Sequence, residues 1–239
     1  RSFSNIVERL TQYTNYLENM SSRLSHELRT PVTVVRSSLE NLGLTASNHE
    51  SAVYIERAEE GIKRLNLILT NMSEATRLEQ MLQTSEKEKI DLVRVLSGCV
   101  EGYKLAYPES KFEIDISEQP IYINGVPEYI AQLLDKLIAN AVEFSYPEQP
   151  VTIFCRSLRD HAIIKVSNAG SYLPEKMKDR LFESMISVRP QVKQDQPHLG
   201  MGLHIARLIT EFHGGKIGAE NRQDREGVVI TVVVPLFYR

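Results

Sequence analysis

The sequence has few cysteines and no pattern that indicates covalent or metal cross-links. Its two cysteines, Cys99 and Cys155, lie among apolar residues and show no metal-ligand spacing. A cysteine metal centre is therefore excluded, and we expect both to be reduced core residues of a cytosolic protein.

Long apolar runs, internal repeats and a large excess of charge are also absent. No run of about 18 apolar residues occurs and no signal peptide opens the chain, so we predict no membrane contact by this chain itself. The net charge of −3 gives no general attraction to nucleic acid. Because the chain begins with Arg1 rather than Met, we expect a fragment of a longer protein.

A long amphipathic stretch opens the chain. Apolar residues from Phe3 to Leu24 recur at alternating spacings of three and four, which is the heptad pattern of a coiled coil. No second matching stripe occurs before residue 50, so a parallel partner chain is expected, although a core helix of a monomer is the alternative. A second helix is predicted from near Glu50 after a stop at Gly43, and two such hairpins make a four-helix bundle.

The later part of the chain predicts a second domain of a different class. Residues 81–89 are polar and lack apolar periodicity, which indicates a linker. Helices and short strands then alternate, as an α/β layered domain requires. The helices are predicted at 92–106, 127–143 and 203–212, and the strands at 112–116, 121–123, 151–155, 162–166, 216–219 and 228–234. The division is 1–20 coiled coil, 21–80 helical hairpin, 81–89 linker and 90–239 α/β domain.

The segment Ser25-His26-Glu27-Leu28-Arg29-Thr30-Pro31 places a nucleophile beside a carboxylate within the first helix. Helical spacing puts His26 and Thr30 on one face. Pro31 removes the N–H that would bond the carbonyl of Glu27, so the helix should bend there. Taken alone, such a histidine is more often structural than catalytic.

Two amide side chains occupy unusual positions in the second domain. Asn140 lies mid-helix, one turn after Lys136, where its oxygen suits a hard cation, although a solvated amide is the simpler interpretation. Asn168 precedes Ala169 and Gly170 at the end of a strand. An amide there suits recognition of a nucleotide base, and an ordinary turn fits equally well.

The glycine pair of Gly200-Met201-Gly202-Leu203 opens a predicted helix, where free N–H groups suit phosphate. The segment from Leu181 to Leu199 precedes it and suggests a mobile cover. A dinucleotide-binding fold is the competitor, but no strand immediately precedes the pair and the third glycine is missing.

Taken in order, these motifs resemble those of the sensor histidine kinases of bacterial two-component systems. Ser25 to Pro31 matches the phosphoacceptor box, Asn140 the asparagine box, and Asn168 to Gly170 the first glycine box. Leu181-Phe182-Glu183 matches the phenylalanine box, and Gly200 to Leu203 the second glycine box. The resemblance implies an α+β multidomain protein, with a dimerisation and phosphotransfer hairpin followed by a Bergerat-type ATP-binding α/β sandwich.

The same resemblance implies roles in the first domain. His26 would attack the γ-phosphorus of ATP, and Glu27 would orient and deprotonate the other ring nitrogen. Thr30 would position a water that dephosphorylates a response regulator. The implied partners are a second copy of the chain and the receiver domain of a response regulator. The implied location is the cytoplasm, where this chain would form the cytosolic part of an inner-membrane receptor.

In the second domain the resemblance implies ATP and Mg²⁺ as cofactors. Asn140 would hold the metal, Asn168 would contact the adenine amine, and Gly170 would admit the base. The full implied nucleotide set is Lys136, Asn140, Asn168, Gly170, Leu173, Gly200, Met201, Gly202 and Leu203.

Four positions depart from the usual pattern of the family. Asn168 replaces the usual aspartate, which predicts weaker discrimination between adenine and guanine because an amide can also donate. Tyr172 replaces a second glycine, Lys136 stands where a second asparagine is frequent, and Glu143 stands where a basic residue is common. These departures leave two rival functions open: a nucleotide-binding scaffold without phosphotransfer, and a coiled-coil interaction module with a structural C-terminal domain.

Overall fold

The computed structural model describes residues 2–44, 48–178, 180–183 and 200–237, with the backbone alone at 2–20, 23 and 48–50. The chain divides into two compact units, one ending at Glu74 and one beginning at Ala75, and each is described by itself. No described helix is both long and apolar enough to cross a membrane.

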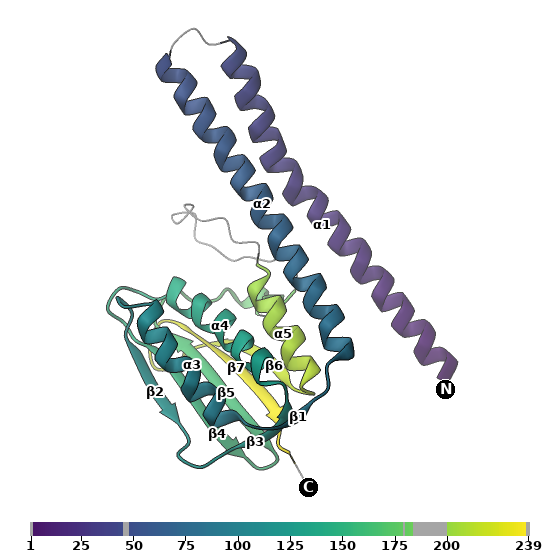
Figure 1. The fold of residues 1–239 in the computed structure, drawn as a ribbon, viewed down its shortest axis with the longest axis vertical. Helices are drawn as coiled ribbons and strands as arrows, with labels where there is room; N and C mark the ends of the chain where they lie inside the picture. The colour runs from purple at the N-terminus through teal and green to yellow at the C-terminus, as the bar shows by residue number, and fades with distance from the viewer. Residues whose placement is uncertain (1, 45–47, 179, 184–199, 238–239) are drawn as a thin grey trace. The chain divides into compact units, whose positions relative to one another are not determined.

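The first unit is a helical hairpin of α1 (Ser2–Leu44) and the first part of α2 (Asn48–Thr84) (Figure 1). The predicted end of the first helix at Gly43 is right to within one residue, and α2 begins two residues before the predicted start near Glu50. Helix α1 continues without interruption through Pro31, which is buried. The heptad residues before Leu24 lie where only the backbone is described.

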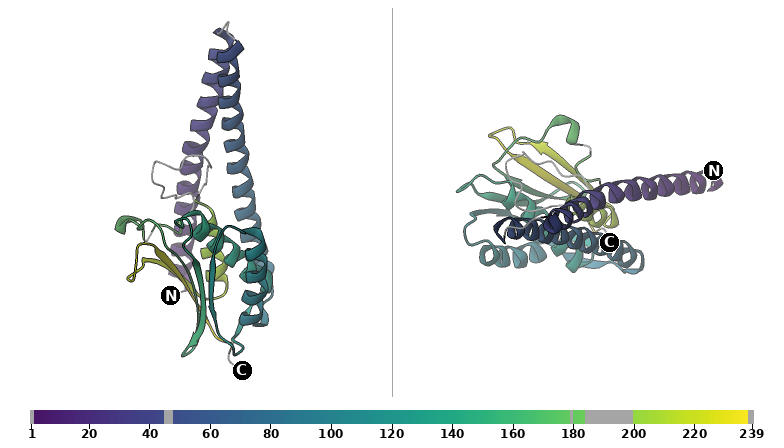
Figure 2. Two further views of the ribbon diagram at one scale, coloured as in Figure 1. Left: turned by 90° about the vertical axis from the view of Figure 1, so that its left-hand side faces the viewer. Right: turned by 90° about the horizontal axis from the view of Figure 1, so that it is seen from above.

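The second unit contains a five-stranded sheet in the order β2-β4-β5-β7-β6, in which only β2 and β4 pair in parallel. Three α-helices that lie wholly within this unit cover one face of the sheet (Figures 1 and 2). The strands are β2 (Phe112–Ile116), β4 (Val151–Leu158), β5 (His161–Asn168), β6 (Lys216–Asn221) and β7 (Val228–Pro235). The helices are α3 (Leu92–Ala106), α4 (Pro127–Glu143) and α5 (Gly202–Phe212).

The core lies between the sheet and these helices. Alternate residues of the central strands are buried there, including Ile153, Cys155, Ile164 and Val232. Cys155 is therefore a core residue as predicted, and burial raises the pKa of its thiol to about 12. Cys99 on α3 is only partly buried, because it lies near the edge of the apolar stripe of that helix.

The polar segment 81–89 contains more regular structure than its composition predicts. Helix α2 continues to Thr84, and β1 (Glu88–Asp91) pairs antiparallel with β3 (Tyr122–Gly125). The ammonium group of Lys89 lies 4.0 Å from the ring centroid of Tyr122. Such cation–π contacts order a lysine-rich segment that has no apolar periodicity.

Helices α3 and α4 begin and end at the predicted residues, and β4 and β5 begin within one residue of their predictions. The two strands extend beyond their apolar runs because the hairpin ladder continues to the pair Leu158 and His161. Arg159 in the connecting turn has φ 54°, a turn conformation that allows the tight reversal. The sequence pattern therefore predicted the core of each strand but not its polar end.

His213 at the end of α5 connects this helix to the start of α4. Its Nδ1–H donates to the carbonyl oxygen of Ile209 at 2.7 Å, and its Nε2 accepts from the N–H of Val126 at 3.2 Å. These partners require the neutral ring. Burial lowers the pKa of His213 from its ordinary value of 6.5.

We therefore predict that the second unit loses stability in mild acid. Because the folded pKa of His213 lies below the unfolded one, stability is complete above about pH 6.5 and falls as the pH decreases toward the folded pKa, by at most about 1.4 kcal/mol per pH unit for one histidine. Denaturant unfolding from pH 7.5 to 5 should show a shallower loss for His213→Gln than for the unaltered chain. Equal slopes would contradict this assignment.

Candidate functional site

His26 and Thr30 are exposed on α1, one helical turn apart. The shared face predicted for them follows from the uninterrupted helix. Their side chains are therefore open to a large reactant.

Glu27 is held toward the second helix of the hairpin. Arg64 on α2 donates from Nη2 to Oε2 of Glu27 at 3.3 Å, and the two side chains are 43% and 35% exposed. A pair this exposed adds no more than about 1 kcal/mol of stability, so its main effect is on the orientation of the carboxylate. Arg64 was missed by sequence reasoning, because nothing local relates it to a residue 37 positions earlier.

Gly61 lets the two helices approach beside the same segment. A Cβ at this position would lie 2.6 Å from Cγ2 of Val35 and 3.2 Å from the carbonyl oxygen of Pro31. Any larger residue would force the helices apart one turn from the pair of Glu27 and Arg64.

In the second unit, Asn168 ends β5 against the C-terminus of α4. Its side chain is buried, and Nδ2 donates to the carbonyl oxygen of Phe144 at 3.0 Å. Gly170 packs on the same carbonyl, because a Cβ there would lie 1.9 Å from the oxygen of Phe144. The first glycine box is therefore fixed by close contact with a helix end, a position where carbonyl groups need partners.

The turn between β6 and β7 supports the other side of this segment. The N–H of Gly170 donates to the carbonyl oxygen of Glu226, and a Cβ on Gly227 would lie 2.0 Å from the carbonyl oxygen of Asn168. Gly227 also has φ 143°, which favours glycine. The polar residues 220–227 between the two predicted closing strands form this turn, and β6 and β7 pair as an antiparallel hairpin.

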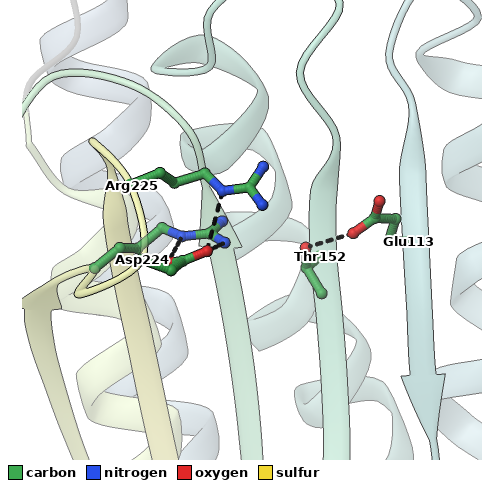
Figure 3. Close-up of polar contacts among 5 residues, drawn as sticks. Glu113, Thr152, Asp224 and Arg225 are labelled. Carbon is green, nitrogen blue, oxygen red and sulfur yellow. Dashed lines mark hydrogen bonds and ion pairs between the residues drawn. The ribbon is translucent and has the colours of Figure 1, made fainter.

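Ion pairs within that turn make it compact. Arg222 contacts Asp224 through Nε at 3.0 Å and Nη2 at 2.8 Å, and Nε of Arg225 lies 3.0 Å from Oδ2 of Asp224 (Figure 3). The hydrogen bonds from Arg222 hold the pKa of Asp224 well below its usual range.

A side-chain hydrogen bond also links two neighbouring strands of the sheet. Thr152 on β4 donates to Glu113 on β2 at 3.4 Å (Figure 3).

Leu173 is held by a two-point contact with Asn221 at the end of β6. The N–H of Leu173 donates to Oδ1 of Asn221 at 2.7 Å, and Nδ2 of Asn221 donates to the carbonyl oxygen of Leu173 at 2.9 Å. The amide thus fixes the backbone of a buried residue from the implied nucleotide set. Asn221 carries no motif signal that would have predicted this role.

A second group of the implied nucleotide residues lies near the start of α5. Gly200 has φ 65°, which favours glycine, and Met201 and Leu203 are buried. A Cβ on Gly202 would lie 4.0 Å from Cδ of Lys136, so α4 and the glycine pair are close together. Within the described residues no side-chain hydrogen bond caps the N-terminus of α5, and the first N–H groups of a helix suit an anion.

The phenylalanine box packs on the same helix. Phe182 is buried, and its carbonyl oxygen lies 3.3 Å from Nδ1 of His204 on α5. Burial lowers the pKa of His204, which favours the neutral ring. The predicted mobile cover falls largely on residues 184–199, outside the described residues.

Asn140 fits the needs of a nucleotide-bound Mg²⁺. No cluster of three or more metal-ligating side chains occurs among the described residues. A magnesium ion carried by phosphates needs only one or two protein oxygens, because phosphates and waters complete its octahedron. Asn140 is half-buried on α4, one turn after Lys136, with no hydrogen bond to its amide among the described side chains.

Two protein-family models match the chain. The model described as the His Kinase A (phospho-acceptor) domain matches residues 16–80, and the model described as the histidine kinase-, DNA gyrase B- and HSP90-like ATPase matches residues 125–237. The sensor protein ChvG of Rhizobium meliloti strain 1021 is 30% identical over 221 residues, which cover 88% of this chain and 38% of that protein.

The chain belongs to the two-component sensor histidine kinases. The sensor protein DltS of Streptococcus agalactiae is 26% identical over 91% of this chain and 54% of its own length. The sensor protein kinase WalK of Staphylococcus haemolyticus is 23% identical over 90% of this chain and 36% of its own length. The chain thus spans about a third to a half of the relatives it matches.

Solved structures of the family share the fold. Histidine kinase ThkA, in complex with response regulator TrrA, has a TM-score of 0.69 at 21% identity and covers 95% of this chain and 64% of its own. Acinetobacter baumannii histidine kinase AdeS has a TM-score of 0.55 at 18% identity and covers 89% and 98%. The predicted fold, a helical hairpin followed by an α/β domain of the Bergerat class, is confirmed.

We predict opposite effects of alanine at two glycines of the second unit. Gly170→Ala should lower the free energy of unfolding by about 1–3 kcal/mol, because its methyl group would overlap the Phe144 carbonyl. Gly98→Ala in α3 has open space around it and should raise that free energy by about 0.5–1 kcal/mol. Denaturant titration of both variants tests this, and a shift of the same sign in both would contradict the described packing.

Proposed function

We propose that this chain is the catalytic part of a sensor kinase that phosphorylates itself on His26 with ATP and passes the phosphoryl group to an aspartate of a response regulator. The observation that carries the proposal is the presence in one chain of an exposed histidine beside Glu27 in a matched phosphoacceptor domain and of a matched ATPase domain. Together these domains supply both an acceptor and a donor site.

In the phosphorylation step, Nε2 of the neutral His26 ring forms a bond to the γ-phosphorus while the bond from that phosphorus to the bridging oxygen breaks. Glu27 accepts the Nδ1 proton as positive charge develops on the ring. Arg64 limits the orientations open to Glu27. When bound, Mg²⁺ with ATP supplies the electrophilic phosphoryl group and neutralises its charge.

In the second unit we assign Asn168, Gly170 and Leu173 to the base of the nucleotide. Lys136 and Asn140 would serve its phosphates and the metal, together with the segment Gly200-Met201-Gly202-Leu203. The proximity of Gly202 to Lys136 and the uncapped start of α5 support this second group.

A second copy of the chain is the expected partner of the hairpin. Several large apolar side chains of the first unit are exposed at about 40–60% in the single chain, a surface that a second hairpin could cover. They are Val32 at 51%, Leu39 at 56%, Val53 at 39%, Ile55 at 48%, Ile62 at 49% and Leu69 at 56%. Dimerisation into a four-helix bundle would bury them.

We further propose that the chain is the cytoplasmic part of an inner-membrane receptor. Residues 1–20 would then carry the signal, residues 21–80 would serve phosphotransfer, and residues 90–239 would bind ATP. Residues 81–89, which include the end of α2 and the start of β1, would link the last two parts. The first helix would carry the signal toward His26, and bending near Pro31 would change its access to the second domain. The relatives are longer than this chain, which fits a protein with further regions.

The direct test uses radiolabelled ATP with Mg²⁺ and the whole chain. We expect acid-labile, base-stable label on the unaltered chain and none on His26→Gln, because phosphohistidine has this stability. His161→Gln, which removes a partly exposed histidine of the second unit, should keep the label. Binding of ATP without label would favour the nucleotide-binding scaffold suggested by Tyr172 and Glu143, and absence of nucleotide binding would favour the interaction module.

Response-regulator phosphatase activity is the second part of the proposal, with Thr30 positioning the attacking water. Thr30→Ala should still become labelled on His26 but should dephosphorylate an accepting receiver domain at least about tenfold more slowly, because positioning of the water is lost. Thr33→Ala is the matched control, since the hydroxyl of Thr33 bonds the carbonyl of Arg29 within the same helix. Equal dephosphorylation rates for the two variants would contradict the role of Thr30.

A further inference from the structure

The Phe144 carbonyl is a fixed acceptor directly beside the residue assigned to the nucleotide base. It lies at the C-terminal end of α4, and the N–H of Phe144 bonds the carbonyl of Asn140. Gly170 packs against it so closely that no Cβ fits between them. This carbonyl oxygen can only accept a hydrogen bond, and Nδ2 of Asn168 donates to it at 3.0 Å.

The contact determines which way the Asn168 amide faces. Rotating the amide by half a turn would place Oδ1 against the Phe144 oxygen, so that two acceptors would meet and the carbonyl would lose its donor. No described residue donates to Oδ1 of Asn168. Among the described residues, the one fully buried side-chain polar atom without a partner is Nε of Arg64, so Oδ1 is not completely closed off from solvent.

We propose that the Phe144 carbonyl makes Asn168 a one-way acceptor, which selects adenine over guanine and makes an amide, not a carboxylate, the required side chain at this position. The inference rests on the proposed nucleotide site. Adenine offers its exocyclic amine to Oδ1, whereas guanine would present a carbonyl oxygen to the same atom. This reverses the weaker discrimination expected from sequence, which treated the amide as free to rotate.

Most members of the family have an aspartate at this position, and the same geometry predicts that an aspartate would fit poorly in this chain. In Asn168→Asp, a carboxylate oxygen would replace the nitrogen that now lies 3.0 Å from the Phe144 oxygen. The repulsion would displace the turn that ends at Gly170 or force uptake of a proton. Restoring the usual family residue should therefore weaken the site.

The test is competition against a ribose-labelled fluorescent ATP analogue, with the whole chain and Mg²⁺ at pH 8. For the unaltered chain we expect GTP to compete at least tenfold more weakly than ATP. Asn168→Asp should lose at least tenfold in affinity for ATP. Asn124→Asp adds the same charge at an exposed position of β3 and should change neither affinity.

A stability measurement tests the contact without any nucleotide. Asn168→Asp should lower the thermal midpoint of the second unit at pH 8, and the loss should shrink toward pH 5, because the protonated carboxyl group can donate to Phe144 as the amide does. Asn124→Asp should show neither effect.

The possible results distinguish failure of this inference from failure of the proposed nucleotide site. Equal competition by ATP and GTP, or full ATP affinity in Asn168→Asp, would overturn the inference while leaving the nucleotide site in place. Failure of the unaltered chain to bind the fluorescent analogue would overturn both. A thermal midpoint of Asn168→Asp that is unchanged at every pH would overturn the proposed effect of the Phe144 carbonyl.

Discussion

The carbonyl oxygen of Phe144 holds the segment from Asn168 to Gly170 in place through two contacts. It accepts from the side chain of Asn168 and leaves no space for a Cβ on Gly170. The opposite side of the same turn is held by Gly227 and by the carbonyl of Glu226. The end of one helix and one compact turn between strands therefore fix the segment that the account assigns to the nucleotide base. Backbone groups outside the segment therefore fix its position and orient the side chain of Asn168.

His26, the proposed acceptor of the phosphoryl group, lies in the first unit, and its surroundings differ from those of Asn168. His26 lies exposed on a long helix, where few contacts restrict it, while Glu27 beside it is tied to Arg64. Gly61 brings the two helices close enough for that pair to form. In the proposed function His26 meets two different reactants, ATP and a receiver domain, and an exposed side chain suits that role. The contact with Arg64 limits the orientation of Glu27, to which we assign the proton of His26.

Much of the fold could be predicted because the signals were local. Pro127 at the start of α4 and the regular apolar spacing of α3 and α4 gave the bounds of these helices. Strand β1 was not predicted, because Lys89 contributes through its position over an aromatic ring, which periodicity does not register. The ends of β4 and β5 depended on pairing between strands.

The candidate site divides in the same way. The order of the motifs predicted the family, which the family models support. Arg64, Asn221 and Phe144 were missed because each acts across a long sequence separation. Phe144 was the hardest to anticipate, since its backbone carbonyl does the work and its side chain gives no signal. For this reason the purine selectivity predicted from the sequence at Asn168 differs from the selectivity that we propose from the contact with Phe144.

A crystal structure of the chain with a non-hydrolysable ATP analogue and Mg²⁺ tests the central claim most directly. We predict that the adenine amine lies within hydrogen-bond distance of Oδ1 of Asn168, while Nδ2 keeps its bond to the carbonyl oxygen of Phe144. An amide turned so that Nδ2 faces the base, or a base bound away from Asn168, would contradict it.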